Sequence, residues 1–216
     1  MPDMSTGDGA ATNPGELVVV RHGESTWNRD HLFQGQADPP LSALGRRQAA
    51  ELAERFRTTG LRAVATSDLA RAHETGAIVA AELGLDLPVV LPDLRERWSR
   101  TLTGLHRDEI EARFPGSVEA WRDGASTELV GDTEPYDVFA TRVLAGLRAA
   151  SELASAVLVV CHGGLFRVLH QVCGTDLRAG VANAAGRRLL VEAGRLVDAG
   201  DAFRPEGTPA TGAEDL

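Results

Sequence analysis

The feature of the sequence that most constrains the fold is an alternation of short apolar runs with longer stretches of helical periodicity. Continuous apolar runs lie at residues 17–20 and 156–160, and a weaker one lies at residues 61–66. Runs of this kind are typical of strands that are covered on both faces, and parallel strands need helical crossovers between them. The sequence therefore predicts an α/β fold, a three-layer α/β/α sandwich with a mostly parallel central sheet.

Ordinary signals mark the ends of the predicted helices. Ser42 is the predicted N-cap of the first long helix, and either Ser67 or Asp68 caps the second, while Gly60 and Gly84 are the predicted stops. Residues 85–135 carry many breakers and are predicted to be largely irregular, a property of segments that cover a site. The other predictions are helices at 107–113, 136–153 and 165–172 and strands at 188–191 and 195–197.

The chain of 216 residues is long enough to bury a substantial core, and 43% of its residues are hydrophobic. No internal repeat or linker divides it. We expect a disordered lead-in at residues 1–14, a single domain over residues 15–204, and a frayed tail at residues 205–216.

The charge of the chain limits its partners. A formal net charge of -9 makes nucleic acid an unsuitable main partner, because binding to a phosphate backbone needs a basic surface. The start of the chain lacks the charged and apolar regions of a signal peptide, and no apolar run approaches the ~20 residues that span a bilayer. We therefore expect a cytoplasmic protein that does not bind membranes; a homodimer is left open. A local cluster of arginines can still bind a small anion.

Histidine, arginine and glycine gather where the predicted strands end. Arg21 and His22 directly follow the first strand, and His162 follows the strand at 156–160 after one intervening residue. Gly163 and the residue after it begin a helix, whose N-terminus favours an anion. Arg71 lies in the first turn of the helix that follows the second strand. Because ligands bind beyond the carboxyl ends of parallel strands, these groups are predicted to share one site.

Five motifs in this order give the chain a resemblance to the histidine phosphatase superfamily, in its phosphoglycerate mutase-like branch. They are RHGES at residues 21–25, FQGQADPPLSALGRRQA at 33–49, SDLARAHET at 67–75, LRERW at 94–98 and VVCHGG at 159–164. Together they extend over most of the chain. The resemblance implies a phosphoglycerate mutase-like fold and chemistry on phosphate esters.

The resemblance also implies a role for each matching residue. His22 would be the nucleophile that forms a phosphohistidine, and Glu96 would be the general acid and then the general base. Protonated His162 would assist. The phosphate would be held by Arg21, Asn28, Arg71, His162 and Gly163. The scheme needs no metal and no cofactor, and the motifs of a metal site are missing from the sequence. Activity would need a neutral His22 together with a protonated Glu96, which predicts a bell-shaped pH profile.

The chain departs from the family pattern after the glutamate, where residues 98–104 read WSRTLTG, and again at residues 131–133, which read GDT. These departures bear on the substrate rather than on the chemistry. The predicted substrate pocket includes Gln34, Trp98 and Arg100, and Arg100 would meet an additional anionic or polar group. We expect the ligand to be a small phosphorylated metabolite.

Three functions are compatible with these motifs. The first is a metal-independent phosphatase acting on a phosphate monoester. The second is a cofactor-dependent phosphoglycerate mutase, which is disfavoured because mutases of the family carry a lysine-bearing segment after the glutamate and this chain contains no lysine. The third is a catalytically silent protein that binds a phosphorylated ligand. Because the chain retains His22, Glu96 and His162, a catalytically active enzyme is favoured over an inactive binding protein.

Overall fold

The computed structural model describes residues 15–122, 131–174 and 181–203. Its centre is a six-stranded sheet in the order β3-β2-β4-β1-β5-β6. Strands β1 to β4 run parallel to one another, and β5 runs antiparallel to both β1 and β6. The mostly parallel sheet predicted from the sequence is therefore confirmed. The strands are β1 (Gly15–Arg21), β2 (Ala63–Thr66), β3 (Val89–Val90), β4 (Ala156–Cys161), β5 (Gly186–Glu192) and β6 (Arg195–Phe203).

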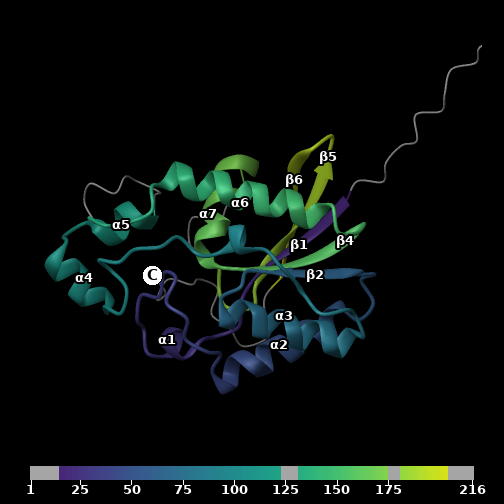
Figure 1. Cartoon of the computed structure of the whole chain (residues 1–216), viewed down its shortest axis with the longest axis horizontal. Helices are drawn as coiled ribbons and strands as arrows, with labels where there is room; N and C mark the ends of the chain where they lie inside the picture. The colour runs from purple at the N-terminus through teal and green to yellow at the C-terminus, as the bar shows by residue number, and fades with distance from the viewer. Residues whose placement is uncertain (1–14, 123–130, 175–180, 204–216) are drawn as a thin grey trace, which may run out of the picture.

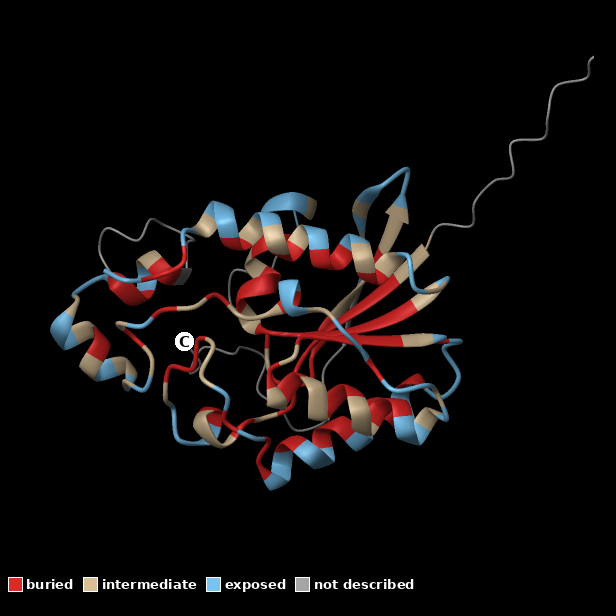
Figure 2. Cartoon of the chain, viewed as in Figure 1, coloured by how far each residue is buried: buried red, intermediate tan, exposed pale blue. Residues whose placement is uncertain are grey.

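Helices cover both faces of this sheet, as Figure 1 shows. Helices α2 (Ala43–Phe56) and α3 (Ala70–Leu83) lie on one face, and α6 (Tyr136–Ser151) and α7 (Gly163–Cys173) lie on the other. Successive side chains of β1 point to opposite faces of the sheet, so they belong to two separate parts of the hydrophobic core. Leu17 and Val19 pack toward α6 and α7, whereas Val18 and Val20 pack toward α2 and α3. The strands and the inner sides of the helices are accordingly buried (Figure 2).

A smaller group of elements lies beyond the carboxyl ends of the strands (Figure 1). It comprises α1 (Thr26–Arg29), α4 (Arg107–Arg113) and α5 (Ser117–Arg122). Its own small core consists of Phe33, Leu102, Ile110, Val118 and Trp121. The 3₁₀ turn η1 (Pro92–Leu94) packs instead against α6, with Leu94 in the main core. The prediction of a helix at 107–113 is confirmed, whereas α1, α5 and β3 were missed. Within the described ranges, no helix is both long and apolar enough to cross a bilayer.

Tertiary contacts explain where the capping predictions succeed and fail. Ser42 caps α2, since its Oγ accepts the Gly45 N–H at 3.0 Å. The predicted cap of α3 at Ser67 or Asp68 is wrong, because α3 begins after Leu69 without a side-chain cap. Both polar side chains have distant partners instead: Ser67 bonds to a histidine on another strand end, and Asp68 pairs with an arginine. The predicted end regions, residues 1–14 and 205–216, lie outside the described residues.

Candidate active site

The register of the parallel strands brings the two catalytic histidine candidates together. Arg21 at the end of β1 pairs with Cys161 at the end of β4, and the His22 N–H donates to the Cys161 carbonyl at 2.9 Å. His22 and His162 are therefore the first residues beyond two adjacent strands, and their ring centres lie 5.1 Å apart. Thr66 ends β2 and pairs with Val160, one residue before Cys161, so Ser67 follows the strand on the side of His162.

The hydrogen bonds of His22 assign its reactive atom. Nδ1 lies 2.7 Å from the Gly23 carbonyl oxygen, which can only accept, so Nδ1 carries the proton. The lone pair is then on Nε2, which accepts a hydrogen bond from Arg71 Nε at 3.2 Å. Burial lowers the pKa of His22 well below its usual value, and the charges of Arg71 and Arg21 lower it further. The neutral form of the ring is therefore favoured, with its lone pair at Nε2.

Arg71 is held rigidly in the interior. Its side chain is among the largest fully buried ones, and its two Nη atoms donate to the carbonyls of Ala37 and Gly35 at 2.7 and 2.8 Å. Burial lowers its pKa to about 10, so the guanidinium remains charged at neutral pH. Arg21, also buried, is oriented by a bond from Nη1 to the Val181 carbonyl at 2.9 Å. Two fixed guanidinium groups thus supply the positive charge that a phosphate needs.

The surroundings of His162 disfavour the protonated ring that the resemblance implies. Burial lowers its pKa well below the usual value, and Arg71, His22 and Arg21 lower it further. Its Nε2 lies 2.7 Å from Ser67 Oγ, while its Nδ1 is buried and has no hydrogen-bond partner among the residues that the structure describes. When the Ser67 hydroxyl donates to Nε2, Nδ1 carries the proton and becomes a neutral donor. Ser67 is a site residue that the sequence reasoning treated only as a cap.

Glu96 approaches the site from the segment that follows η1. Its Oε2 accepts the Gly164 N–H in the first turn of α7 at 2.9 Å, and its Oε1 accepts the Arg97 N–H at 2.7 Å. The carboxylate therefore lies at the same helix N-terminus that follows His162. A side chain at Gly164 would not fit, because a Cβ there would be 2.2 Å from Glu96 Oε1. Gly163 has more room, since its nearest neighbour would be Arg21 at 3.8 Å.

Asn28 completes the set of predicted phosphate ligands. It is buried at the end of a short capped turn, where its Oδ1 accepts the Ser25 N–H at 3.1 Å and the Asn183 amide at 3.3 Å. These bonds fix the amide so that its NH₂ group is available as a donor. Asn183 also donates to the His22 carbonyl at 3.0 Å. No motif in the sequence pointed to Asn183, because its contribution depends on a contact across 161 positions.

Gly23 lies where two backbone segments approach each other closely. A Cβ at Gly23 would lie 2.5 Å from the Gly45 carbonyl oxygen, and one at Gly45 would lie 2.1 Å from the Glu24 carbonyl oxygen. Gly23 is not among the residues with a positive φ. Glycine is needed here because two backbones meet, and the contact seats the start of α2 against the segment that carries His22.

A cavity of about 550 Å³ lies beside the candidate active site. It is lined by Gln36, Ala37, Trp98, Ser99, Arg100 and Thr103. Two of the three predicted pocket residues, Trp98 and Arg100, line it. Gln34 is not part of this lining; its Oε1 accepts the Ser25 hydroxyl at 2.8 Å, and Gln36 takes the place at the cavity. Arg100 lies over the Trp98 ring at 5.4 Å and reaches Asp132 at 3.1 Å.

Among the described residues, no group of three or more histidine, cysteine, aspartate or glutamate side chains is placed to hold a metal ion. The arrangement is instead one of two buried imidazoles, two buried guanidiniums and a carboxylate. The sequence of the chain matches the histidine phosphatase superfamily, branch 1, over residues 17–194. The chain belongs to the histidine phosphatase superfamily.

Individual relatives agree with this assignment. The chain is 34% identical over 178 residues to the metal-independent phosphoserine phosphatase of Arabidopsis thaliana, covering 81% of this chain and 72% of that protein. It is 35% identical over 150 residues to a protein of Enterobacter sp. (strain 638) named "Probable phosphoglycerate mutase GpmB", covering 68% and 69% of the two chains. A solved structure of mycobacterial glucosyl-3-phosphoglycerate phosphatase with VO3 superposes with a TM-score of 0.72 at 29% identity, covering 88% and 98%. This histidine phosphatase therefore has the phosphoglycerate mutase-like fold.

Proposed function

We propose that this histidine phosphatase hydrolyses a phosphate monoester of a small metabolite, without a metal ion, through a phosphohistidine on His22. The observation that carries the proposal is the state of the His22 ring. Nδ1 donates to the Gly23 carbonyl, so the lone pair is at Nε2, against Arg71. A buried neutral imidazole beside cationic donors is suited to attack a phosphorus atom whose oxygens those donors bind.

In the first step, Nε2 of His22 forms a bond to phosphorus while the ester P–O bond breaks. The departing oxygen keeps the electron pair of that bond and takes a proton from the Glu96 carboxyl group. Arg21 and Arg71 bind the phosphoryl oxygens as charge redistributes. The Gly23 carbonyl, which accepts the Nδ1 proton, stabilises the positive charge of the phosphorylated ring.

In the second step, water attacks phosphorus and gives a proton to the Glu96 carboxylate. The P–N bond breaks, its electron pair returns to Nε2, and inorganic phosphate leaves. Both Glu96 oxygens accept backbone N–H groups, from Gly164 and Arg97, and these bonds hold the carboxylate in place for this step. The cycle ends with neutral His22 and protonated Glu96, as it began.

For the substrate, we propose a small phosphate ester that carries a second anionic group. Arg100 lines the cavity beside the site, and its ion pair with Asp132 is exposed to solvent, so its guanidinium can bind such a group as well or in place of Asp132. The names of two relatives, a phosphoserine phosphatase and a glucosyl-3-phosphoglycerate phosphatase, each describe a phosphate ester that also bears a carboxylate. The cytoplasmic location and the homodimer considered from the sequence stay predictions.

The experiment that tests the function measures phosphate release in the presence of EDTA by the wild-type protein and by His22→Ala. The panel contains phosphoserine, 3-phosphoglycerate, sugar phosphates, nucleotides and p-nitrophenyl phosphate. We expect release that survives EDTA and is lost in His22→Ala, with the carboxylate-bearing esters among the best substrates. Release that is abolished by EDTA, or that persists in the variant, would overturn the proposal.

A mutase activity is the second candidate, because one relative is named as a phosphoglycerate mutase. The same His22 chemistry would serve it, with transfer to a second hydroxyl in place of water. Incubation with 3-phosphoglycerate and 2,3-bisphosphoglycerate distinguishes the two. Formation of 2-phosphoglycerate without net phosphate release would identify a mutase, and phosphate release alone identifies the phosphatase.

A further inference from the structure

A buried ion pair lies behind the segment that carries Glu96. The guanidinium of Arg142, on α6, donates to both carboxylate oxygens of Glu134, from Nε to Oε1 and from Nη2 to Oε2, each at 2.7 Å. The Arg142 side chain is 18% exposed and that of Glu134 is 5% exposed. Because the pair is bidentate and largely out of water, its geometry is fixed.

The remaining donors of Arg142 all bind backbone carbonyls of the segment that carries Glu96. Nη1 donates to the Asp93 carbonyl at 2.9 Å and to the Arg95 carbonyl at 2.7 Å, and Nη2 donates to the carbonyl of Glu96 itself at 2.9 Å. With the two bonds to Glu134, all five N–H donors of the guanidinium are used. One side chain therefore fixes the path of the backbone up to the carboxylate-bearing residue.

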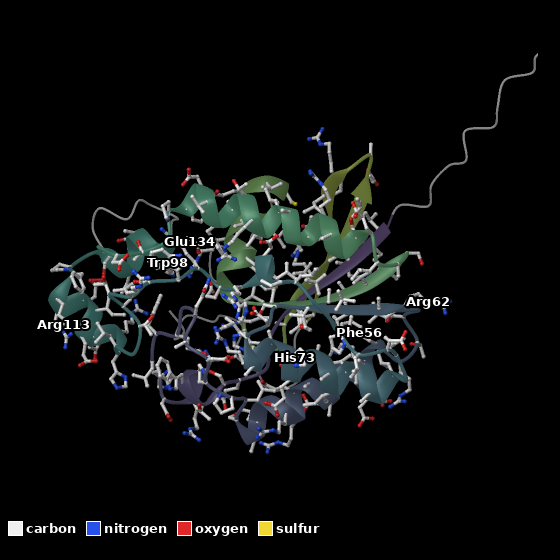
Figure 3. The ribbon with its side chains drawn as sticks, viewed as in Figure 1. Phe56, Arg62, His73, Trp98, Arg113 and Glu134 are labelled. Carbon is white, nitrogen blue, oxygen red and sulfur yellow. The ribbon has the colours of Figure 1, made fainter. Side chains whose placement is uncertain are left out.

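Glu134 fixes the backbone on the other side of Glu96. Its N–H donates to the Trp98 carbonyl at 3.0 Å, and its Oε2 accepts the Trp98 N–H at 3.3 Å. Its own carbonyl accepts Arg97 Nε at 2.8 Å. Trp98 and Glu134 lie close together in Figure 3, on the two segments that these bonds join. Glu96 is thus held from both sides by one ion pair.

We propose that Arg142 and Glu134 are positioning residues that set the general acid, Glu96, for proton transfer. The inference rests on the proposed function, because it assigns the pair a part in the phosphatase reaction. A buried ion pair gives little net stability over a well-packed apolar pair, so stability alone is a weak reason for it here. Proton transfer, by contrast, needs the donor within hydrogen-bond reach of the departing oxygen, and small displacements are costly.

The dependence of activity on the leaving group separates positioning from general structural damage. p-Nitrophenyl phosphate releases an acidic phenol that needs little protonation, whereas phenyl phosphate has nearly the same shape and a poorer leaving group. A displaced Glu96 harms the second reaction more than the first. Arg142→Lys keeps the positive charge but removes the planar, bidentate guanidinium. The variant therefore tests the hydrogen-bond geometry and not the electrostatic effect of the charge.

We expect Arg142→Lys to lower kcat/KM about tenfold for phenyl phosphate and by less than about threefold for p-nitrophenyl phosphate. The tenfold loss is a part of the roughly 10²–10⁴-fold rate enhancement that a general acid supplies. Glu134→Gln should show the same inequality, and it provides the test if Arg142→Lys does not fold. Arg148→Lys, on the exposed side of the same helix, is the matched control and should leave both values unchanged. Thermal melts of each variant report folding.

Two results would overturn the inference: equal losses for the two esters in both variants, or no loss in either. The proposed function fails in a different way. It fails if the wild-type protein releases phosphate from none of the esters of the panel above, or if Glu96→Gln shows no dependence on the leaving group. One outcome refutes the positioning role alone. In it, the wild-type protein behaves as expected and Glu96→Gln shows a leaving-group effect, but Arg142→Lys and Glu134→Gln show none.

Discussion

Replacing Gly164 by alanine should reduce catalysis strongly while leaving the fold intact. The new Cβ would lie 2.2 Å from Glu96 Oε1, whereas ordinary contacts begin at 3.4 Å, so the carboxylate must move by about 1.2 Å. It would also lose the 2.9 Å bond from the Gly164 N–H. Because a displacement of about 1 Å can cost ~100-fold in rate, we expect kcat/KM for phenyl phosphate to fall about 100-fold.

The stability of the same variant should change little. Alanine in a helix is favoured over glycine by roughly 0.5–1 kcal/mol. That gain offsets most of the roughly 0.5–1.5 kcal/mol lost with one hydrogen bond. The tight contact with Phe139, 3.1 Å from the new Cβ, adds a small cost. We therefore expect the free energy of unfolding to stay within about 1 kcal/mol of the wild-type value, as measured by urea denaturation.

Steady-state kinetics on both aryl phosphates, together with the urea curves, check this prediction. Gly163→Ala is the contrast one residue away. Its Cβ would lie 3.8 Å from Arg21, and its N–H is retained, so its loss should be no more than about threefold. Wild-type kinetics in a folded Gly164→Ala protein would refute the reasoning, because Glu96 would then be tolerant of displacement or unnecessary.

Four other predictions follow from the site. Because burial lowers the pKa of His22 and of His162, the unfolded chain binds more protons than the folded one below pH ~6.5. The free energy of unfolding should therefore fall as the pH falls below that value, by up to about 1.4 kcal/mol per histidine per pH unit, and melts at pH 7.5 and 5.5 with equal midpoints would contradict this. The acid limb of the kcat/KM profile should lie below pH ~6.5, as a neutral His22 requires, whereas a flat profile from pH 5 to 8 would count against the scheme. Ser67→Ala should lower kcat/KM about 3- to 10-fold, the value of one hydrogen bond, and should change the ¹⁵N shifts of the His162 ring; unaltered shifts would show that Ser67 does not set its tautomer. Arg100→Ala should raise KM several-fold for phosphoserine but not for p-nitrophenyl phosphate, which has no second anionic group, and an unchanged KM for phosphoserine would remove Arg100 from the pocket.

The parts of the fold that follow local rules could be predicted from the sequence. The strands at 17–20 and 156–160 and the helix at 107–113 have clear periodicity, and the structure has β1, β4 and α4 at these places. Ser42 caps α2 as predicted, since its partner, the Gly45 N–H, is three residues away. The fold class followed from the order of these elements, which is a property of the chain rather than of its contacts.

The parts that depend on distant partners could not be predicted. Ser67 looked like a helix cap, but its hydroxyl binds His162, 95 positions away. The bonds of Arg142 to the backbone around Glu96 link α6 to a segment almost 50 residues earlier, and no local pattern indicates them. Asn183 is equally remote from His22 in the sequence. The motifs supplied the reacting groups, whereas the residues that orient them emerge only when the chain is folded.

The register between β1 and β4 has a consequence for how a chain of this kind can diversify. The spacing of His22 and His162 is set by the ladder of β1 and β4, which ends with the pair of Arg21 and Cys161. The cavity lining belongs instead to segments outside the sheet, at residues 36–37 and 98–103. Insertions and substitutions in those segments can therefore alter which ester is accepted while the two imidazoles keep their separation. The separation of the two imidazoles and the shape of the cavity are therefore set by different parts of the chain.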